Sequence, residues 1–115
     1  MTQHYRHFSA PAAARLVGVT YRQIDHAIRI GVFEPETPAS GSGSRRELSL
    51  KDVLRLRAAR ILSEELEITI PQALELVPRD ADLEGMVVVH PSQRTTVQVD
   101  LSLEPELEHE LELTA

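Results

Sequence analysis

Apolar residues recur every three or four positions in two early segments of the chain, 10–17 and 21–30. This spacing places them on one side of a helix, so each segment is predicted to be helical. Ser9 and Thr20 are good N-cap residues for the two helices, and Gly18 lies in the short link between them. Two short helices joined through a glycine are the arrangement of a helix-turn-helix.

Two further helices are predicted after a turn-rich stretch. Residues 34–47 contain prolines and a Gly/Ser run and include the pair Arg45 and Arg46, which indicates a flexible hairpin tip followed by a short basic strand. The sequence 49–52 matches a capping box and starts a helix that should run to about Leu66. A shorter helix is predicted from Ile70 or Pro71 to Val77.

The long third helix has a broad apolar face and an opposite face that carries Arg55, Arg57 and Arg60. We expect these arginines to be mostly solvated, with one of them contacting phosphate or pairing with a glutamate.

Beyond Pro78 the pattern changes from helical spacing to alternation. Segments 85–90 and 95–103 are rich in β-branched residues, and in the second of them apolar and polar residues alternate with a period of two. This pattern predicts a β-hairpin, which must pack on the domain or on another chain because an isolated hairpin is marginal in water. The remaining segment alternates Glu with Leu and is predicted to be a solvated tail.

These patterns predict a mainly α fold, namely a winged helix-turn-helix of about four helices with a short β wing, followed by a C-terminal β-hairpin. The domain boundaries expected are a flexible N-terminus at 1–8, the winged helix-turn-helix at 9–78, the hairpin at 79–103 and an acidic, disordered tail at 104–115.

The net charge of −6 hides a division between the two halves of the chain. Residues 1–63 hold ten Lys and Arg against five Asp and Glu, whereas residues 64–115 hold two against thirteen. Such asymmetry is typical of a basic nucleic-acid-binding domain with an acidic appendage.

Composition excludes several classes of protein. The chain has no cysteine, which rules out disulfides and thiolate metal sites. No apolar run approaches the roughly 20 residues that cross a bilayer, and no segment of signal-peptide type begins the chain, so we expect a cytoplasmic protein with no membrane contact. There is also no nucleophile elbow, phosphate-binding glycine loop or His-x-x-x-His pair. We therefore expect no enzyme, cofactor or metal site.

The order of elements resembles the MerR family of transcription regulators. Residues 8–24 resemble the opening of MerR-type domains, with a first helix, the turn Gly18-Val19-Thr20 and an Arg-bearing recognition helix. Residues 29–35 are similar to the exit from that helix, and residues 41–53 to the wing and the start of the next helix. Coverage is about 8–77. The resemblance implies a regulator that binds double-stranded DNA.

Side chains near the start of a recognition helix reach base edges and phosphates in the major groove. The residues expected to read bases are Tyr21, Arg22, Gln23 and His26. Those expected to contact phosphate or the minor groove are Arg15, Arg29, Arg45 and Arg46.

The sequence also departs from the family. Asp25 stands where many members carry an arginine, and His26 with Ala27 replaces an aromatic pair. Because a carboxylate repels phosphate, Asp25 must either accept from a cytosine amino group or orient a neighbouring arginine. Glu47-Leu48 replaces the tyrosine of the wing.

Larger MerR-type regulators continue with a long dimerisation helix and an effector domain, and neither is evident here. We expect a homodimer, with the hairpin as its contact through Val87, Val89, Val97, Val99 and Leu101; the alternative is that the hairpin only caps its own domain.

The predicted function is a sequence-specific, DNA-binding transcription regulator of MerR type without a separate effector domain. Two alternatives stay open: an excisionase-like architectural DNA-binding protein, and an interaction adaptor that engages a protein partner through the acidic C-terminus.

Overall fold

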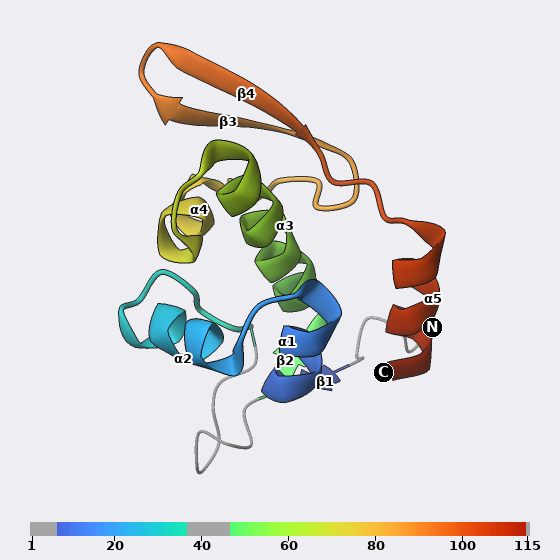
Figure 1. Ribbon diagram of the computed structural model, residues 1–115. Helices are drawn as coiled ribbons and strands as arrows, with labels where there is room; N and C mark the ends of the chain where they lie inside the picture. The colour runs from blue at the N-terminus through green and yellow to red at the C-terminus, as the bar shows by residue number, and fades with distance from the viewer. Residues whose placement is uncertain (1–6, 37–46, 115) are drawn as a thin grey trace.

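The computed structural model describes residues 7–36 and 47–114. In these residues five helices and two pairs of antiparallel strands surround a mainly aliphatic core (Figure 1). In chain order the elements are β1 (His7–Ser9), α1 (Ala10–Val17), α2 (Tyr21–Arg29), β2 (Glu47–Ser49), α3 (Leu50–Leu66), α4 (Ile70–Leu76), β3 (Met86–Ser92), β4 (Thr95–Asp100) and α5 (Pro105–Thr114). The prediction of a mainly α fold is confirmed, and the first four helices begin and end within about one residue of the predicted positions.

The side chains at the helix starts explain why the helices begin where they do. The Ser9 hydroxyl accepts from the backbone N–H of Ala12 at the start of α1. Full capping boxes start α2, α3 and α4, with Thr20, Ser49 and Thr69 as the N-cap residues. Each cap satisfies backbone N–H groups that have no partner inside the helix.

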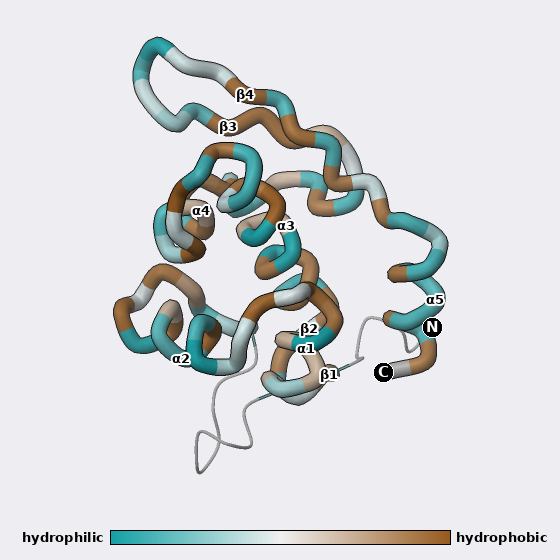
Figure 2. The backbone as a smooth tube through the Cα atoms, in the orientation of Figure 1, coloured by the Kyte–Doolittle hydropathy of each residue, from teal (hydrophilic) through white to brown (hydrophobic). Residues whose placement is uncertain are grey.

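Helix α3 forms the centre of the core and packs against α1 on one side and α4 on the other. Leu56, Ala59 and Leu62 of α3 are fully buried, together with Phe33 from the segment that follows α2. Figure 2 shows hydrophobic stretches along α3, α4 and β3, the elements that enclose this core. None of the helices within the described residues is long and apolar enough to cross a bilayer.

The expected boundary of the N-terminal segment needs correction. His7 and Phe8, which were expected in a flexible N-terminus, belong to β1, where Phe8 pairs with Leu48 of β2. The side chains of Phe8 and Leu48 are both buried in the core. The partner strand lies some forty residues further along the chain, so no local pattern could predict this pairing.

The inner face of the β3–β4 pair packs on its own domain. The valines expected to form a dimer contact, Val87, Val89 and Val99, are buried, as is Leu101, and Val97 is partly buried. Since α4 and the core already cover this face, the structure favours the alternative in which the hairpin caps its own domain. The outer face carries the exposed Met86 and Val88.

An arginine of α3 ties the segment after β4 to the core. Arg57 is only 6% exposed, and its guanidinium donates to the carbonyl oxygens of Leu101 (2.7 Å) and Ser102 (3.0 Å). The expectation that this face of α3 is mostly solvated is wrong at Arg57. Burying an arginine is costly unless its donors find partners, and here two backbone carbonyls supply them.

The C-terminal segment is a helix rather than the solvated, disordered tail that was expected. Leu107 and Leu111 are four residues apart, so in a helix they lie on one face. Leu111 is 3% exposed, and α5 packs against α1 (Figure 1). Pro105 at the first position and Glu106 and Glu108 in the first turn suit a helix start. The alternation of Glu with Leu made the helical spacing of Leu107 and Leu111 hard to recognise in the sequence.

Candidate nucleic-acid interface

Helices α1 and α2 are held together by a tight turn. Gly18 ends α1 with a left-handed backbone (φ +82°), and its N–H donates to the Ala14 carbonyl. Glycine adopts the left-handed conformation at little energetic cost because it has no Cβ, whereas a residue with a side chain would be strained there. Thr20 then starts α2, so the two helices follow each other with three residues between them.

Helix α2 presents a polar stripe on its outer side. Ile24 and Ala27 are buried towards the core, whereas Arg22, His26 and Arg29 are exposed. These three residues have the spacing i, i+4, i+7 and so share one face. Tyr21 adds a ring that is 41% exposed at the start of the helix. The structure therefore brings together most of the residues expected to contact DNA.

Gln23 has a structural role that the sequence analysis missed. Its side-chain oxygen accepts from the Thr20 N–H (2.9 Å), while the Thr20 hydroxyl accepts from the Gln23 N–H (3.0 Å). The Thr-x-x-Gln spacing was the signal that could have revealed this capping box. A paired contact to adenine would use the same oxygen, one of whose two lone pairs is already engaged in the cap, whereas the amide N–H groups of Gln23 are not used by it.

Asp25 and Arg29 form an ion pair along α2. The Arg29 guanidinium donates to one Asp25 carboxylate oxygen, over the i, i+4 spacing. The Arg29 side chain is 78% exposed and that of Asp25 only 25%. This geometry favours the second of the two roles considered for Asp25, in which the carboxylate orients a neighbouring arginine.

Two other arginines lie close to the first two helices. Arg15 is exposed in the last turn of α1. Arg60 of α3 pairs with Glu64 at 2.9 Å, and its Cδ would lie 3.3 Å from a Cβ at Gly18. Its pairing with a glutamate matches one expectation for this face of α3, but its contact with the turn was not predicted. Arg45 and Arg46 lie outside the described residues.

A buried aspartate fixes the exit from α2 to the start of α3. Asp52 is almost fully buried, and its carboxylate accepts from the backbone N–H groups of Ser49 (3.0 Å) and Glu36 (3.1 Å). Burial raises the pKa of Asp52, and these hydrogen bonds oppose that shift in part. The link holds the chain after α2 against α3.

The arrangement offers hydrogen-bond donors and positive charge to a ligand, but no metal cluster. Within residues 7–36 and 47–114, no three His, Asp or Glu side chains are grouped so that they could hold a metal ion.

Comparison with known proteins identifies the family. The model for the MerR HTH family of regulatory proteins matches residues 8–80, which is more than half of the chain. The chain belongs to the MerR family. This match confirms the resemblance predicted from the sequence and covers β1 to α4.

Relatives of this MerR-family chain include HTH-type transcriptional regulators from Mycobacterium bovis and Mycobacterium tuberculosis, which are themselves described as uncharacterized. Each is 39% identical over 56 residues, which are 48% of this chain and 25% of the relative. The chain thus matches only about a quarter of their length. No solved structure gives a significant match.

Proposed function

We propose that this chain is a sequence-specific DNA-binding transcription regulator that places α2 in the major groove of duplex DNA. The observation that carries the proposal is the exposed stripe of Arg22, His26 and Arg29 on a helix anchored by the short turn. In this reading α1 and α2 are the helix-turn-helix, and the β1–β2 pair forms the base of the wing.

Residues near the start of α2 suit contacts to bases, whereas Arg29 at its end suits contacts to phosphates. Arg22, near the start of α2, can donate two parallel hydrogen bonds to guanine. Tyr21 and His26 supply further contacts to base edges, and Gln23 contributes through its amide N–H groups. Arg29, oriented by Asp25, and Arg15 suit phosphate contacts, and the sequence adds Arg45 and Arg46 as wing contacts.

A homodimer remains part of the proposal, because many helix-turn-helix proteins read paired half-sites as dimers. Since the inner valine face is covered, the dimer contact must lie elsewhere. The free edges of β3 and β4 and the outer side chains Met86 and Val88 offer the best alternative.

The experiment is a selection of binding sites from random duplexes, followed by affinity measurements with Arg22→Ala. We expect this change to weaken binding to the best site by about 1–3 kcal/mol and to relax the sequence preference. Arg94→Ala, in the β3–β4 turn at the far end of the molecule from α2, is the matched control and should bind as the parent does (Figure 1). Unchanged affinity and sequence preference in the Arg22→Ala variant would contradict the assignment of Arg22 to base contact.

Two further measurements, DNA bending and duplex binding at low salt, distinguish an architectural or adaptor role from that of a transcription regulator. An excisionase-like protein would bend tandem sites without changing transcription. An adaptor would bind no duplex even at low salt; the exposed Met86 and Val88 and the acidic first turn of α5 are the observations that support such a protein contact.

A further inference from the structure

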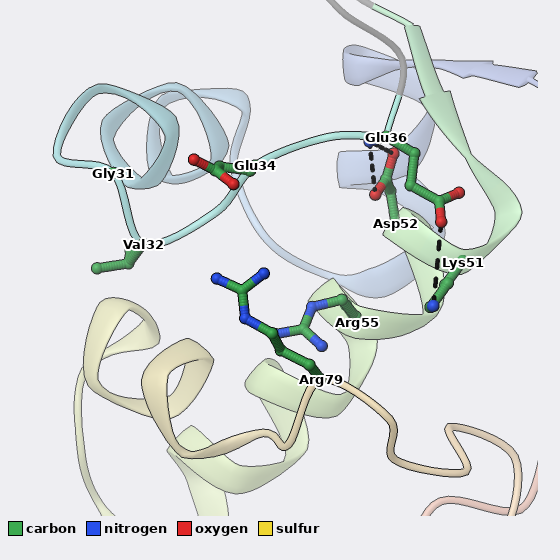
Figure 3. A pocket seen from close by; sticks show the side chains of 8 residues that line it. All are labelled: Gly31, Val32, Glu34, Glu36, Lys51, Asp52, Arg55 and Arg79. Atoms are coloured by element: carbon green, nitrogen blue, oxygen red, sulfur yellow. Dashed lines mark hydrogen bonds and ion pairs between the residues drawn. The ribbon is translucent and has the colours of Figure 1, made fainter.

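A small cavity follows the end of α2, and none of its lining residues belongs to the stripe expected to contact DNA. It has a volume of about 250 Å³ and lies between the segment after α2, the first turns of α3 and the segment after α4. Figure 3 shows that charged side chains from all three segments line it. Nothing in the proposed DNA contact uses these side chains.

Two arginines meet in this cavity. Arg55 extends from α3, and Arg79 follows α4 three residues after the helix ends; in Figure 3 the Arg79 guanidinium points towards the segment that carries Glu34. The Arg55 guanidinium donates to the carbonyl oxygens of Pro78 (3.3 Å) and Val77 (3.5 Å). Burial lowers the pKa of Arg55, and the positive charge of Arg79 lowers it further. Both guanidinium groups line the same cavity, where their positive charges repel each other, whereas Asp52 favours the charged form of Arg55.

Among the described residues, the carboxylates around the cavity form no direct ion pair with either arginine. Asp52 is occupied by backbone N–H groups, and Glu36 lies 4.0 Å from Lys51. Glu34 lies on the opposite side of the cavity from the two arginines. Among the described residues no carboxylate oxygen lies within 4.0 Å of a nitrogen of Arg55 or Arg79. Two like charges thus face one cavity, whose lining also holds Glu34, Glu36 and Asp52 without a direct ion pair to either arginine.

We propose that this cavity binds a small oxyanion, a carboxylate or phosphate group of a free molecule, between Arg55 and Arg79. Guanidinium groups present paired N–H donors that match the two oxygens of a carboxylate or phosphate. Arg55 is already oriented by its two backbone contacts, so little side-chain freedom is lost when it binds.

The size and the lining of the cavity favour a small free anion over the DNA backbone. A volume of about 250 Å³ is below the roughly 300–1,000 Å³ of typical drug-sized sites, so the ligand should be small. Glu34 and Glu36 also line the cavity and repel a polyanion as extended as DNA. The bound anion would connect the exit of α2 to α3 and to the end of α4, and would so stabilise the fold.

The test uses the full chain, labelled with ¹⁵N and titrated with inorganic phosphate and separately with citrate at constant ionic strength. Saturable shifts of Gly31, Val32 and the Arg55 side chain are expected, together with a rise in the melting temperature. Arg79→Gln should weaken binding roughly tenfold, because a charged hydrogen-bond partner is lost. Arg94→Gln is the matched surface control and should respond as the parent does. An equal response of the Arg79→Gln variant, or no saturable shift, overturns the proposal.

A second arm distinguishes a free anion from a DNA phosphate. DNA affinity is measured for Arg79→Gln without phosphate in the buffer, and the proposal predicts the affinity of the parent chain. A loss as large as that of Arg22→Ala would assign the cavity to DNA and overturn the proposal of a free ligand. Because the anion titration contains no DNA, its result does not depend on whether the proposed DNA-binding function holds.

Discussion

At the scale of single residues, two aspartates with opposite surroundings offer a direct check. Burial raises the pKa of Asp52 above its ordinary value of 3.8. Hydrogen bonds from the Ser102 hydroxyl and N–H lower the pKa of Asp100. A ¹³C titration of the side-chain carboxyl groups should therefore show Asp52 losing its proton at a higher pH than Asp100. The reverse order would contradict the burial of Asp52 or the hydrogen bonds of Asp100.

The two shifts have opposite consequences for stability. The folded chain holds the Asp52 proton to a higher pH than the unfolded chain, so the contribution of Asp52 is present at pH below 3.8 and is lost as pH rises through its folded pKa. The contribution of Asp100 is present above 3.8 and is lost as pH falls through its folded pKa.

Residue roles were predictable where a local spacing encodes them. Helical spacing predicted that Arg22 and Arg29 are exposed, and the departure at Asp25 already suggested an arginine partner. Arg57 could not be predicted, because its acceptors lie 44 and 45 residues away. Only tertiary contacts turn this arginine from a surface residue into a buried one.

At the scale of elements, alanine substitutions at two glycines allow the turn before α2 to be compared with the turn after it. Gly18 and Gly31 both have a left-handed backbone, with φ of +82° and +85°. Alanine at either position should cost about 1–2 kcal/mol of stability. Gly18→Ala should cost more, because its Cβ would approach Arg60 Cδ to 3.3 Å, whereas nothing lies within 4 Å at Gly31.

Chemical denaturation of the two variants measures this difference. The excess cost of Gly18→Ala should shrink in an Arg60→Ala background, where the close neighbour is absent. If Gly18→Ala costs no more than Gly31→Ala, Arg60 does not pack over the turn.

Helix α5 makes a second prediction at this scale. Leu111 is 3% exposed and Leu113 is 72% exposed on the same helix. Leu111→Ala should lower the free energy of unfolding by about 2 kcal/mol or more, as other buried leucines do. Leu113→Ala should change it by less than about 0.5 kcal/mol. Equal, small effects of both changes would indicate that α5 does not dock on α1.

The elements themselves were predictable to different degrees. Apolar spacing and cap residues predicted α1 to α4, because both signals are local. Strand β1 has three residues and no periodicity of its own, so its pairing with β2 depends on burial of Phe8 against Leu48. The leucine spacing of α5 was present in the sequence, but its glutamates favoured a solvated tail.

At the scale of the whole molecule, the division of charge has a spatial counterpart. The basic half contains α1, α2 and most of α3, whereas the acidic half contains the β3–β4 pair and α5. Figure 1 shows the β3–β4 pair at the opposite end of the molecule from α2, with α3 and α4 between them. The net charge of −6 is thus compatible with a local attraction of α2 for DNA. The sequence predicted the division, but not the arrangement, which depends on the packing of the hairpin and α5.

The central claim is that α2 contacts duplex DNA, and an NMR titration tests it most directly. The ¹⁵N-labelled chain is titrated with its selected duplex at low salt and again at higher salt. If α2 binds the duplex, the largest shifts should fall on residues 21–29, residues 86–100 should change little, and binding should weaken as salt rises. Shifts confined to the β3–β4 pair or α5, or no binding to any duplex at low salt, would show that α2 is not the DNA contact.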